Sequence, residues 1–173
     1  LVNDILDFSK IEAGQLELVE ATYQFVPLMQ AEILLLNARI NGKPLTTKIE
    51  VSPDIPTRLF GDEMRIKQVL TNLLSNAVKY TKEGTITLKA FSKQVDKDNV
   101  VLYFAVTDTG IGIKEEDLSK LFSSFKRLEL NKNRNIEGTG LGLNIAKQLV
   151  NLMQGDITVE SEYGKGSIFT VSI

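Results

Sequence analysis

Residues 62–80, DEMRIKQVLTNLLSNAVKY, carry the pattern that decides the fold class. Asp62 is a residue type that often caps helices, because its carboxylate can accept a hydrogen bond from an unpaired N–H group of the first turn. The segment predicts a helix from Asp62 to Tyr80 with an apolar stripe broad enough to pack on a sheet. The stripe consists of Ile66, Val69, Leu70, Leu73, Leu74, Ala77 and Val78.

A second face of this helix is polar. It carries Gln68, Asn72, Asn76, Lys79 and Tyr80, which recur at helical spacing. Asparagine lowers helix propensity, so two of them one turn apart indicate a role other than helix formation. An amide oxygen can ligate Mg²⁺, whose other ligands are then waters and phosphate oxygens, and a lysine adds positive charge. The face suits a metal-bound polyphosphate, and an ordinary solvated helix face is the alternative.

The rest of the chain alternates between helical and strand patterns. We expect helices over residues 1–14, 25–40, 114–121 and 141–153, and strands over 15–23, 45–51, 85–95, 100–107, 156–161 and 167–173. Most strands are spaced to pair as hairpins, which predicts an α/β architecture: a mixed sheet covered by helices on one face. The first apolar stripe is too short for an isolated helix and is typical of the tail of a longer one. Since the chain starts at Leu1, we expect it to be a piece of a longer protein.

The composition excludes several chemistries. The 173 residues suffice for one domain with a sizeable core. They include no Cys and no His, which removes disulfides, thiolate nucleophiles, Ser-His-Asp triads and Cys or His metal sites. The net charge of −2 gives no reason to expect nucleic acid or an anionic membrane as a partner. No stretch reaches the ~20 apolar residues that span a bilayer.

Three glycine clusters follow the helix: 108–113 (DTGIGI), 138–143 (GTGLGL) and 164–167 (GKGS). The second begins a predicted helix, where open N–H groups favour an anion. It does not match the dinucleotide fingerprint, because Leu143 occupies the last glycine position, and no segment matches the P-loop motif. The third cluster is equally well a hairpin turn. The first contains the Asp-Thr-Gly triplet of aspartic proteases, which would need a second copy of the chain for its second carboxylate.

The order of these motifs resembles that of sensor histidine kinases in the GHKL ATPase superfamily. Residues 72–81 (NLLSNAVKYT), 108–112 (DTGIG), 122–125 (FSSF), 138–143 and 164–167 match the N, G1, F, G2 and G3 boxes in order and spacing. The resemblance implies a Bergerat fold. This is a two-layer α/β sandwich with a mixed sheet, helices on one face, and the nucleotide between the helices and a lid.

The resemblance divides the chain in two. Residues 15–173 would be the catalytic, ATP-binding domain, and residues 1–14 the C-terminal end of a dimerisation and phosphoacceptor hairpin, as in hybrid kinases. The implied cofactors are ATP and Mg²⁺. The implied partners are the protein's own dimerisation domain, a response-regulator receiver domain, and a second full-length copy as a homodimer. The implied location is cytoplasmic, in a parent protein whose membrane anchoring the sequence does not reveal.

The resemblance also assigns residues to the base end of the nucleotide. Asp108 would accept a hydrogen bond from the adenine amino group. Gly110 and Gly112 would let the backbone approach the base. Ile113 and Ser167 would lie beside them.

At the triphosphate end, the resemblance implies three catalytic residues. Asn76 would hold Mg²⁺, while Asn72 and Lys79 would face the phosphates. Tyr80 would lie near the nucleotide, and the segment 126–137 would form the lid. Further contacts would come from Phe122 and Phe125, which anchor the lid, from Arg134 or Lys132 at the γ-phosphate, and from the N–H groups of Gly138, Thr139, Gly140, Leu141 and Gly142.

The residue type at position 72 separates two kinds of chemistry. In hydrolysing relatives, the residue four before the Mg²⁺-holding Asn is a Glu that activates water, whereas here it is Asn72. An amide cannot take a proton at neutral pH, so attack by water lacks a base. The expected reaction is transfer of the γ-phosphate to a His on a dimerisation domain absent from this chain, for relay to a response-regulator Asp. The alternatives are a non-catalytic nucleotide-binding module and the protease dimer.

Overall fold

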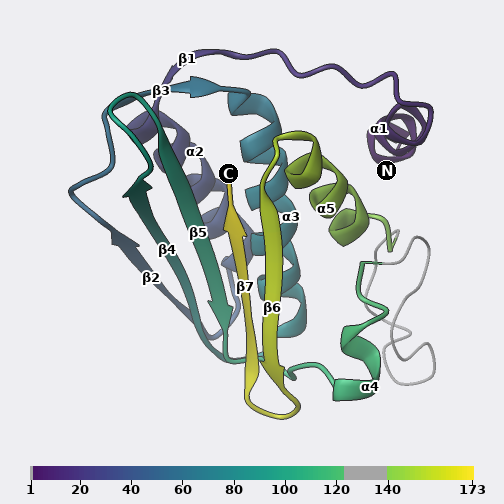
Figure 1. The fold of residues 1–173 in the computed structure, drawn as a ribbon. Coiled ribbons are helices and arrows are strands. Elements are labelled where there is room, and N and C mark those ends of the chain that lie inside the picture. Colours follow the sequence, from purple (N-terminus) through teal and green to yellow (C-terminus); the bar gives the residue numbers. More distant parts are fainter. Residues whose placement is uncertain (1, 123–139) are drawn as a thin grey trace.

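The computed structural model describes residues 2–122 and 140–173. The elements form two layers, a sheet on one side and helices α2, α3 and α5 on the other (Figure 1). No helix within these residues has the length and the apolar run that crossing a bilayer requires. In chain order the elements are α1 (Val2–Glu12), β1 (Ala21–Gln24), α2 (Phe25–Ile40), β2 (Leu45–Val51), β3 (Arg58–Gly61), α3 (Glu63–Tyr80), β4 (Gly84–Gln94), β5 (Val100–Asp108), α4 (Glu115–Leu118), α5 (Gly142–Leu152), β6 (Asp156–Glu162) and β7 (Gly166–Ser172).

The main sheet has the strand order β2-β4-β5-β7-β6. β2 runs parallel to β4, and the other neighbouring pairs are antiparallel. Because the sheet contains one parallel pair beside antiparallel hairpins, the mixed sheet expected from the sequence is confirmed. A separate antiparallel ribbon joins β1 to β3. β5 lies in the middle of the main sheet, so its last residue is held by strands on both sides.

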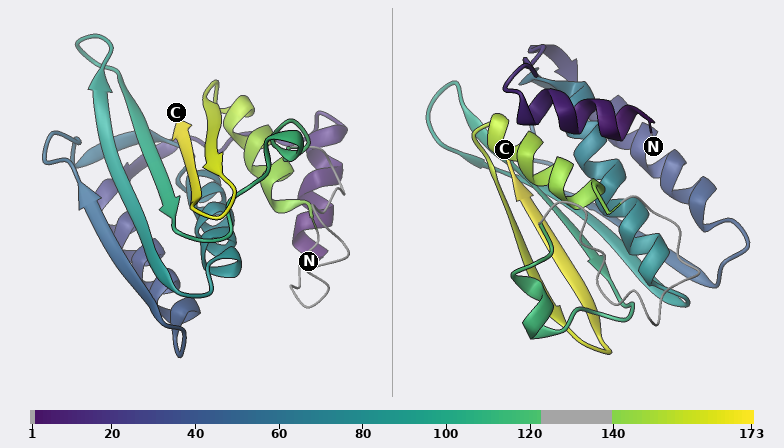
Figure 2. Two further views of the ribbon diagram at one scale, coloured as in Figure 1. Left: turned by 90° about the horizontal axis from the view of Figure 1, so that it is seen from below. Right: turned by 90° about the vertical axis from the view of Figure 1, so that its right-hand side faces the viewer.

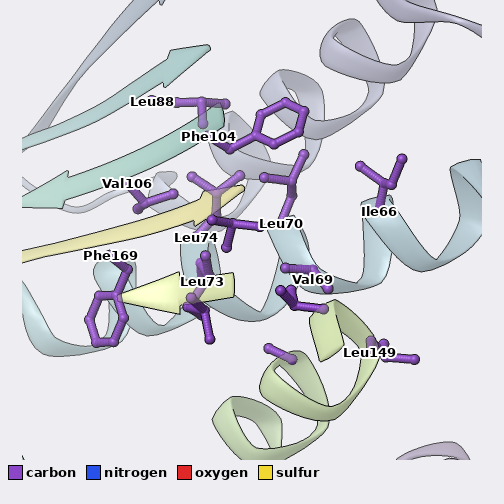
Figure 3. Packing of buried hydrophobic residues seen from close by; sticks show 14 of the residues in the cluster. Ile66, Val69, Leu70, Leu73, Leu74, Leu88, Phe104, Val106, Leu149 and Phe169 are labelled. Carbon is purple, nitrogen blue, oxygen red and sulfur yellow. The ribbon is translucent and has the colours of Figure 1, made fainter. Parts of the chain in front are cut away.

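Helix α3 packs its apolar stripe on the sheet. All seven residues of the predicted stripe are buried. They meet inward-facing side chains of the strands, among them Leu88, Phe104 and Phe169 (Figure 3). The predicted cap is confirmed, because Asp62 Oδ1 accepts a hydrogen bond from Arg65 N at 3.0 Å. Burial of the stripe fixes the rotation of α3 and therefore the direction of its polar face.

Several expected elements differ from the observed ones. The predicted helix 25–40 and strand 45–51 match α2 and β2. The strand expected over 15–23 is wrong except for its end, because only β1 finds a partner strand. That partner, β3, was not expected, since four residues are too few for a periodic pattern. The helix expected over 114–121 is shortened to α4.

Helix α1 ends where the sequence predicts. Gly14 has φ +64°, and Gln15 N donates to Lys10 O at 2.8 Å, which closes the last turn. Phe8 and Ile11 pack against the core, and α1 contacts α5 (Figure 2). The assignment of this helix to a dimerisation hairpin stays a prediction.

Candidate functional site

Asp108, the last residue of β5, is a buried carboxylate at one end of the site. In the sheet register it lies between Ile86 of β4 and Ser167 of β7. Its Oδ1 accepts a hydrogen bond from Gly110 N at 2.8 Å and lies 3.5 Å from Thr81 Oγ1, which donates to it. The carboxylate is therefore held by β5, by the loop after it, and by the residue that ends α3.

The environment of Asp108 favours a ligand that donates a hydrogen bond. Burial raises the pKa of Asp108 above its ordinary value of 3.8, while hydrogen bonds from Gly110 N–H, the Thr81 hydroxyl and Ser167 N–H lower it in part. A buried carboxylate is unfavourable unless donors satisfy its oxygens. An exocyclic amino group is such a donor, which agrees with the predicted role of Asp108.

The loop after Asp108 packs closely against the end of α3, and this packing requires a glycine at position 110. A Cβ at this position would lie 2.8 Å from Asp108 Oδ1 and 2.8 Å from Thr81 Oγ1, and would collide with the Tyr80 carbonyl oxygen. Gly112 has φ +63°, and a Cβ there would collide with the backbone of the β6–β7 hairpin. The loop therefore packs against its neighbours as closely as glycine allows.

Two serines connect the loop to the β6–β7 hairpin. Ser161 Oγ accepts a hydrogen bond from Ile113 N at 2.8 Å, donates to Gly166 O at 2.8 Å, and lies 3.0 Å from Ser167 Oγ. The predicted residues Ile113 and Ser167 are thus brought to one end of the site. Sequence reasoning missed Ser161 and Thr81. Thr81 closes the N-box motif and could have been found, whereas Ser161 depends on its register opposite Ser167.

The other end of the site lies where α3 meets the start of α5. A Cβ on Gly142 would lie 3.2 Å from Asn72 Oδ1, so the Asn72 amide lies against the first turn of α5. Gly140, with φ +73°, precedes this turn, and Leu141 at the N-cap makes no side-chain cap hydrogen bond. The first N–H groups of a helix lack intrahelical acceptors and attract anions. The glycine-rich helix start and the amide face are therefore neighbours at Gly142 and Asn72.

The remaining predicted residues of α3 lie on the same helix and are half-buried. They are Asn76, Lys79 and Tyr80. Lys79 Nζ lies 5.0 Å from the centroid of the Tyr80 ring. The Tyr80 carbonyl oxygen accepts a hydrogen bond from Ile111 N at 3.2 Å. Helix α3 thus links the Asp108 end of the site to the α5 end.

A metal ion at this site would be bound by a side-chain amide oxygen. Among residues 2–122 and 140–173, no group of three or more acidic side chains could hold a metal ion. The amide oxygen of Asn76 is a hard ligand that Mg²⁺ accepts, provided that phosphate and water oxygens complete the shell. The predicted residues that lie outside the described part of the chain are Phe125, Lys132, Arg134, Gly138 and Thr139.

Phe122 is the last residue of the described range 2–122, and it contacts two side chains of α5. Asn144 Nδ2 donates a hydrogen bond to Phe122 O at 2.7 Å. Lys147 Nζ lies 5.9 Å from the centroid of the Phe122 ring. The sequence motifs pointed to Phe122 but not to Asn144, which lies just after the glycine cluster.

Comparison with known families agrees with this geometry. The family model described as "Histidine kinase-, DNA gyrase B-, and HSP90-like ATPase" matches residues 61–173. The chain belongs to this ATPase family. The matched region contains both ends of the site, from the start of α3 to the end of β7. The fold class and the resemblance drawn from the motifs are confirmed, and the protease alternative loses its support.

Within this ATPase family, the chain is similar to sensor histidine kinases. It is 41% identical to hybrid signal transduction histidine kinase B of Dictyostelium discoideum and 42% identical to sensor histidine kinase GacS of Pseudomonas protegens, in each case over all 173 residues. Because these stretches are 9% and 19% of the two proteins, the chain spans about a tenth to a fifth of the curated relatives it matches. A solved structure, full-length ShkA in complex with AMPPNP, has a TM-score of 0.83 and 32% identity, over 99% of this chain and 34% of that chain.

Proposed function

We propose that the chain binds Mg-ATP and transfers the γ-phosphate to a histidine on a dimerisation domain outside these 173 residues. The observation that carries the proposal is the buried carboxylate of Asp108, which the close-packed loop at Gly110 holds at the end of β5. Further support comes from ShkA, whose structure contains the ATP analogue AMPPNP, and from the histidine kinases to which the chain is similar.

The triphosphate end supplies hard oxygen ligands and N–H donors. In the proposal, Asn76 ligates Mg²⁺ through its amide oxygen, while Asn72 and Lys79 face the phosphates. The N–H groups at the start of α5 receive oxygens of the β- and γ-phosphates. When bound, Mg²⁺ neutralises the charge that develops on these oxygens during transfer.

Asn72 favours phosphoryl transfer over hydrolysis. Its amide lies at the phosphate end but cannot deprotonate a water molecule. An acceptor imidazole brings its own lone pair: the bond from its nitrogen to the γ-phosphorus forms while the bond from that phosphorus to the bridging oxygen breaks, and ADP leaves. Catalysis then depends on positioning and charge neutralisation.

We assign helix α1 to the end of a dimerisation hairpin in a full-length homodimer. The hairpin would present the acceptor histidine, and a receiver domain would take the phosphate onto an aspartate. The hybrid kinase among the relatives supports this arrangement. The described chain would then be the catalytic part of a cytoplasmic signalling region.

Titration calorimetry with Mg-ATP tests the binding step. Wild-type protein and the variant Asp98→Asn, an exposed aspartate in the β4–β5 loop, should bind equally well. Asp108→Asn should bind about a hundredfold more weakly, because an amide presents a donor where an acceptor is needed. If Asp108→Asn bound Mg-ATP as tightly as wild type, the proposed recognition of adenine at this end of the site would be wrong.

A transfer assay tests the chemical step. Radiolabelled ATP, the wild-type chain and a separately expressed histidine hairpin should give a labelled hairpin, with no label on the chain itself because it has no His. Tight Mg-ATP binding without labelling of the hairpin would favour the non-catalytic binding module. Rapid ATP hydrolysis without any acceptor would contradict the kinase proposal.

A further inference from the structure

Asn144, in the first turn of α5, is a buried polar residue that the proposed chemistry does not use. Only 7% of its surface is exposed. Its Nδ2 donates a hydrogen bond to Phe122 O at 2.7 Å. Its Oδ1 is buried and has no hydrogen-bond partner among the residues that the structure describes.

The orientation of this amide is determined by its neighbour. If the amide were flipped, Oδ1 would face the Phe122 carbonyl oxygen, and two acceptors would repel each other. The donor must therefore face Phe122, and Oδ1 is left in a buried position without a donor. A buried acceptor without a partner is unfavourable, and an apolar residue would avoid this penalty. Asn144 is thus a poor choice for filling space, and its bond to Phe122 is the feature that an apolar residue could not supply.

Lys147 supports the same contact from one turn further along α5. Its Nζ lies 5.9 Å from the centroid of the Phe122 ring and 2.7 Å from Asp156 Oδ1 at the start of β6. Residues three apart on a helix share a face, so Asn144 and Lys147 hold Phe122 together. This face of α5 is therefore tied to Phe122 and to the sheet.

The first turn of α5 is also in contact with the amide face of α3. Gly142 lies against Asn72, as the 3.2 Å separation between a Cβ at position 142 and Asn72 Oδ1 indicates. The first turn of α5 is thus held between Asn72 on one side and Phe122 on the other. A change in the bond between Asn144 and Phe122 would shift the N–H groups relative to the amides of α3.

We propose that Asn144 is a positioning residue for the nucleotide: its buried amide fixes the first turn of α5 against Phe122 and so aligns the N–H groups of that turn with Asn72. This inference rests on the proposed binding of Mg-ATP. It assigns to Asn144 a contribution to nucleotide affinity that is separate from any contribution to folding.

Two variants of Asn144, each with a matched control, test this role. Asn144→Leu removes both polar groups at nearly constant size, and Asn144→Asp keeps the shape but removes the donor. Asn151→Leu and Asn151→Asp make the same changes at an exposed position of the same helix. The measurements are urea unfolding without nucleotide and calorimetric titration with Mg-ATP.

The expected result is a separation of stability from affinity. Asn144→Leu should unfold at the same urea concentration as wild type or a higher one, yet bind Mg-ATP about tenfold more weakly. Asn144→Asp should show the same loss of affinity, and it decides the question if the leucine variant does not fold. The Asn151 controls should bind like wild type.

Two outcomes would overturn the inference. One is affinity equal to that of the Asn151 controls. The other is a loss of affinity that disappears when binding is measured at a temperature where the variants are fully folded. A wild-type chain that does not bind Mg-ATP would instead refute the proposed function, so the two failures can be told apart.

Discussion

The two ends of the candidate site are built in different ways. At the base end, Asp108 is buried and hydrogen-bonded, and the glycines around it leave no room for a methyl group. At the triphosphate end, Asn72, Asn76 and Lys79 are half-buried along one helix, and Asn72 lies against the start of another. The base end combines one buried carboxylate with a closely packed backbone, whereas the triphosphate end depends on several half-buried side chains.

This difference has consequences for substitution. A small increase in size should damage the base end, because the interior is close-packed and backbone atoms cannot move aside. A change of functional group at constant size should alter the reaction at the triphosphate end, where charge and proton transfer are at stake, whereas at Asp108 it should alter binding. Each of the following predictions tests one side of this comparison.

Gly166→Ala should have the largest effect, on stability. Gly166 has φ +124°, and a Cβ there would collide with the Asp108 carbonyl oxygen. We expect a loss of more than about 3 kcal/mol in the free energy of unfolding. Gly164→Ala is the matched control in the same hairpin: Gly164 has φ +87°, but no atom lies within 4 Å of its Cβ position. It should lose only about 1–2 kcal/mol, and equal losses in urea denaturation would contradict the close packing at Asp108.

Asn72→Glu should change the reaction at the triphosphate end without a large change in stability. The carboxylate can accept a proton from water, so ATP hydrolysis in the absence of an acceptor should rise at least about tenfold. Asn72→Gln has the same length without a base, and its hydrolysis rate should stay near that of wild type. The measurement is ADP release at saturating Mg-ATP. If both variants hydrolyse ATP at the same rate, the identity of residue 72 does not decide between transfer and hydrolysis.

The stability of the base end should depend on pH through Asp108. Burial raises the pKa of this carboxyl in the folded state above its ordinary value of 3.8, so the folded state binds a proton more readily than the unfolded state. This contribution to stability is fully present below pH 3.8 and is lost as the pH rises through the raised value. Asp108→Asn does not titrate, so its unfolding free energy relative to wild type should increase with pH across that window. A difference that does not vary with pH would contradict the raised pKa.

The sequence predicts those features of the molecule that are encoded within one segment. Local periodicity was sufficient for α3, because its buried stripe and its Asp62 cap are encoded within one segment. The motifs were sufficient to name Asp108 and the glycines through the resemblance. They could not reveal Ser161, whose role requires the pairing of β6 with β7. Nor could they reveal that Lys43 Nζ donates to the Val78 carbonyl oxygen at 2.9 Å, since these residues lie 35 positions apart.

Strand β3 and the role of Asn144 also depend on contacts between distant segments. Strand β3 exists only because it pairs with β1, and its four residues show no pattern of their own. Asn144 lies on a helix that was predicted, but its partner is the carbonyl oxygen of Phe122, 22 residues earlier in the chain. Properties that depend on one segment were predictable, and contacts between distant segments required the fold.

The smallest predicted effect concerns the contact between α1 and the triphosphate end. Asp7 Oδ2 accepts a hydrogen bond from Gln68 Nε2 at 2.7 Å and lies 3.5 Å from Arg65 Nη1. Gln68 is one turn before Asn72 on α3, so this contact joins α1 to the helix face that we propose faces the phosphates. Asp7→Asn should lower the free energy of unfolding by only about 0.5 kcal/mol, because the pair is partly exposed. If α1 acts on the triphosphate end alone, Asp7→Asn should weaken Mg-ATP binding about twofold and leave adenosine binding unchanged. The control Asp98→Asn should change the affinity for neither ligand. An equal loss of affinity for adenosine and Mg-ATP would mean that α1 influences the whole site, and that the two ends are not separable as their packing implies.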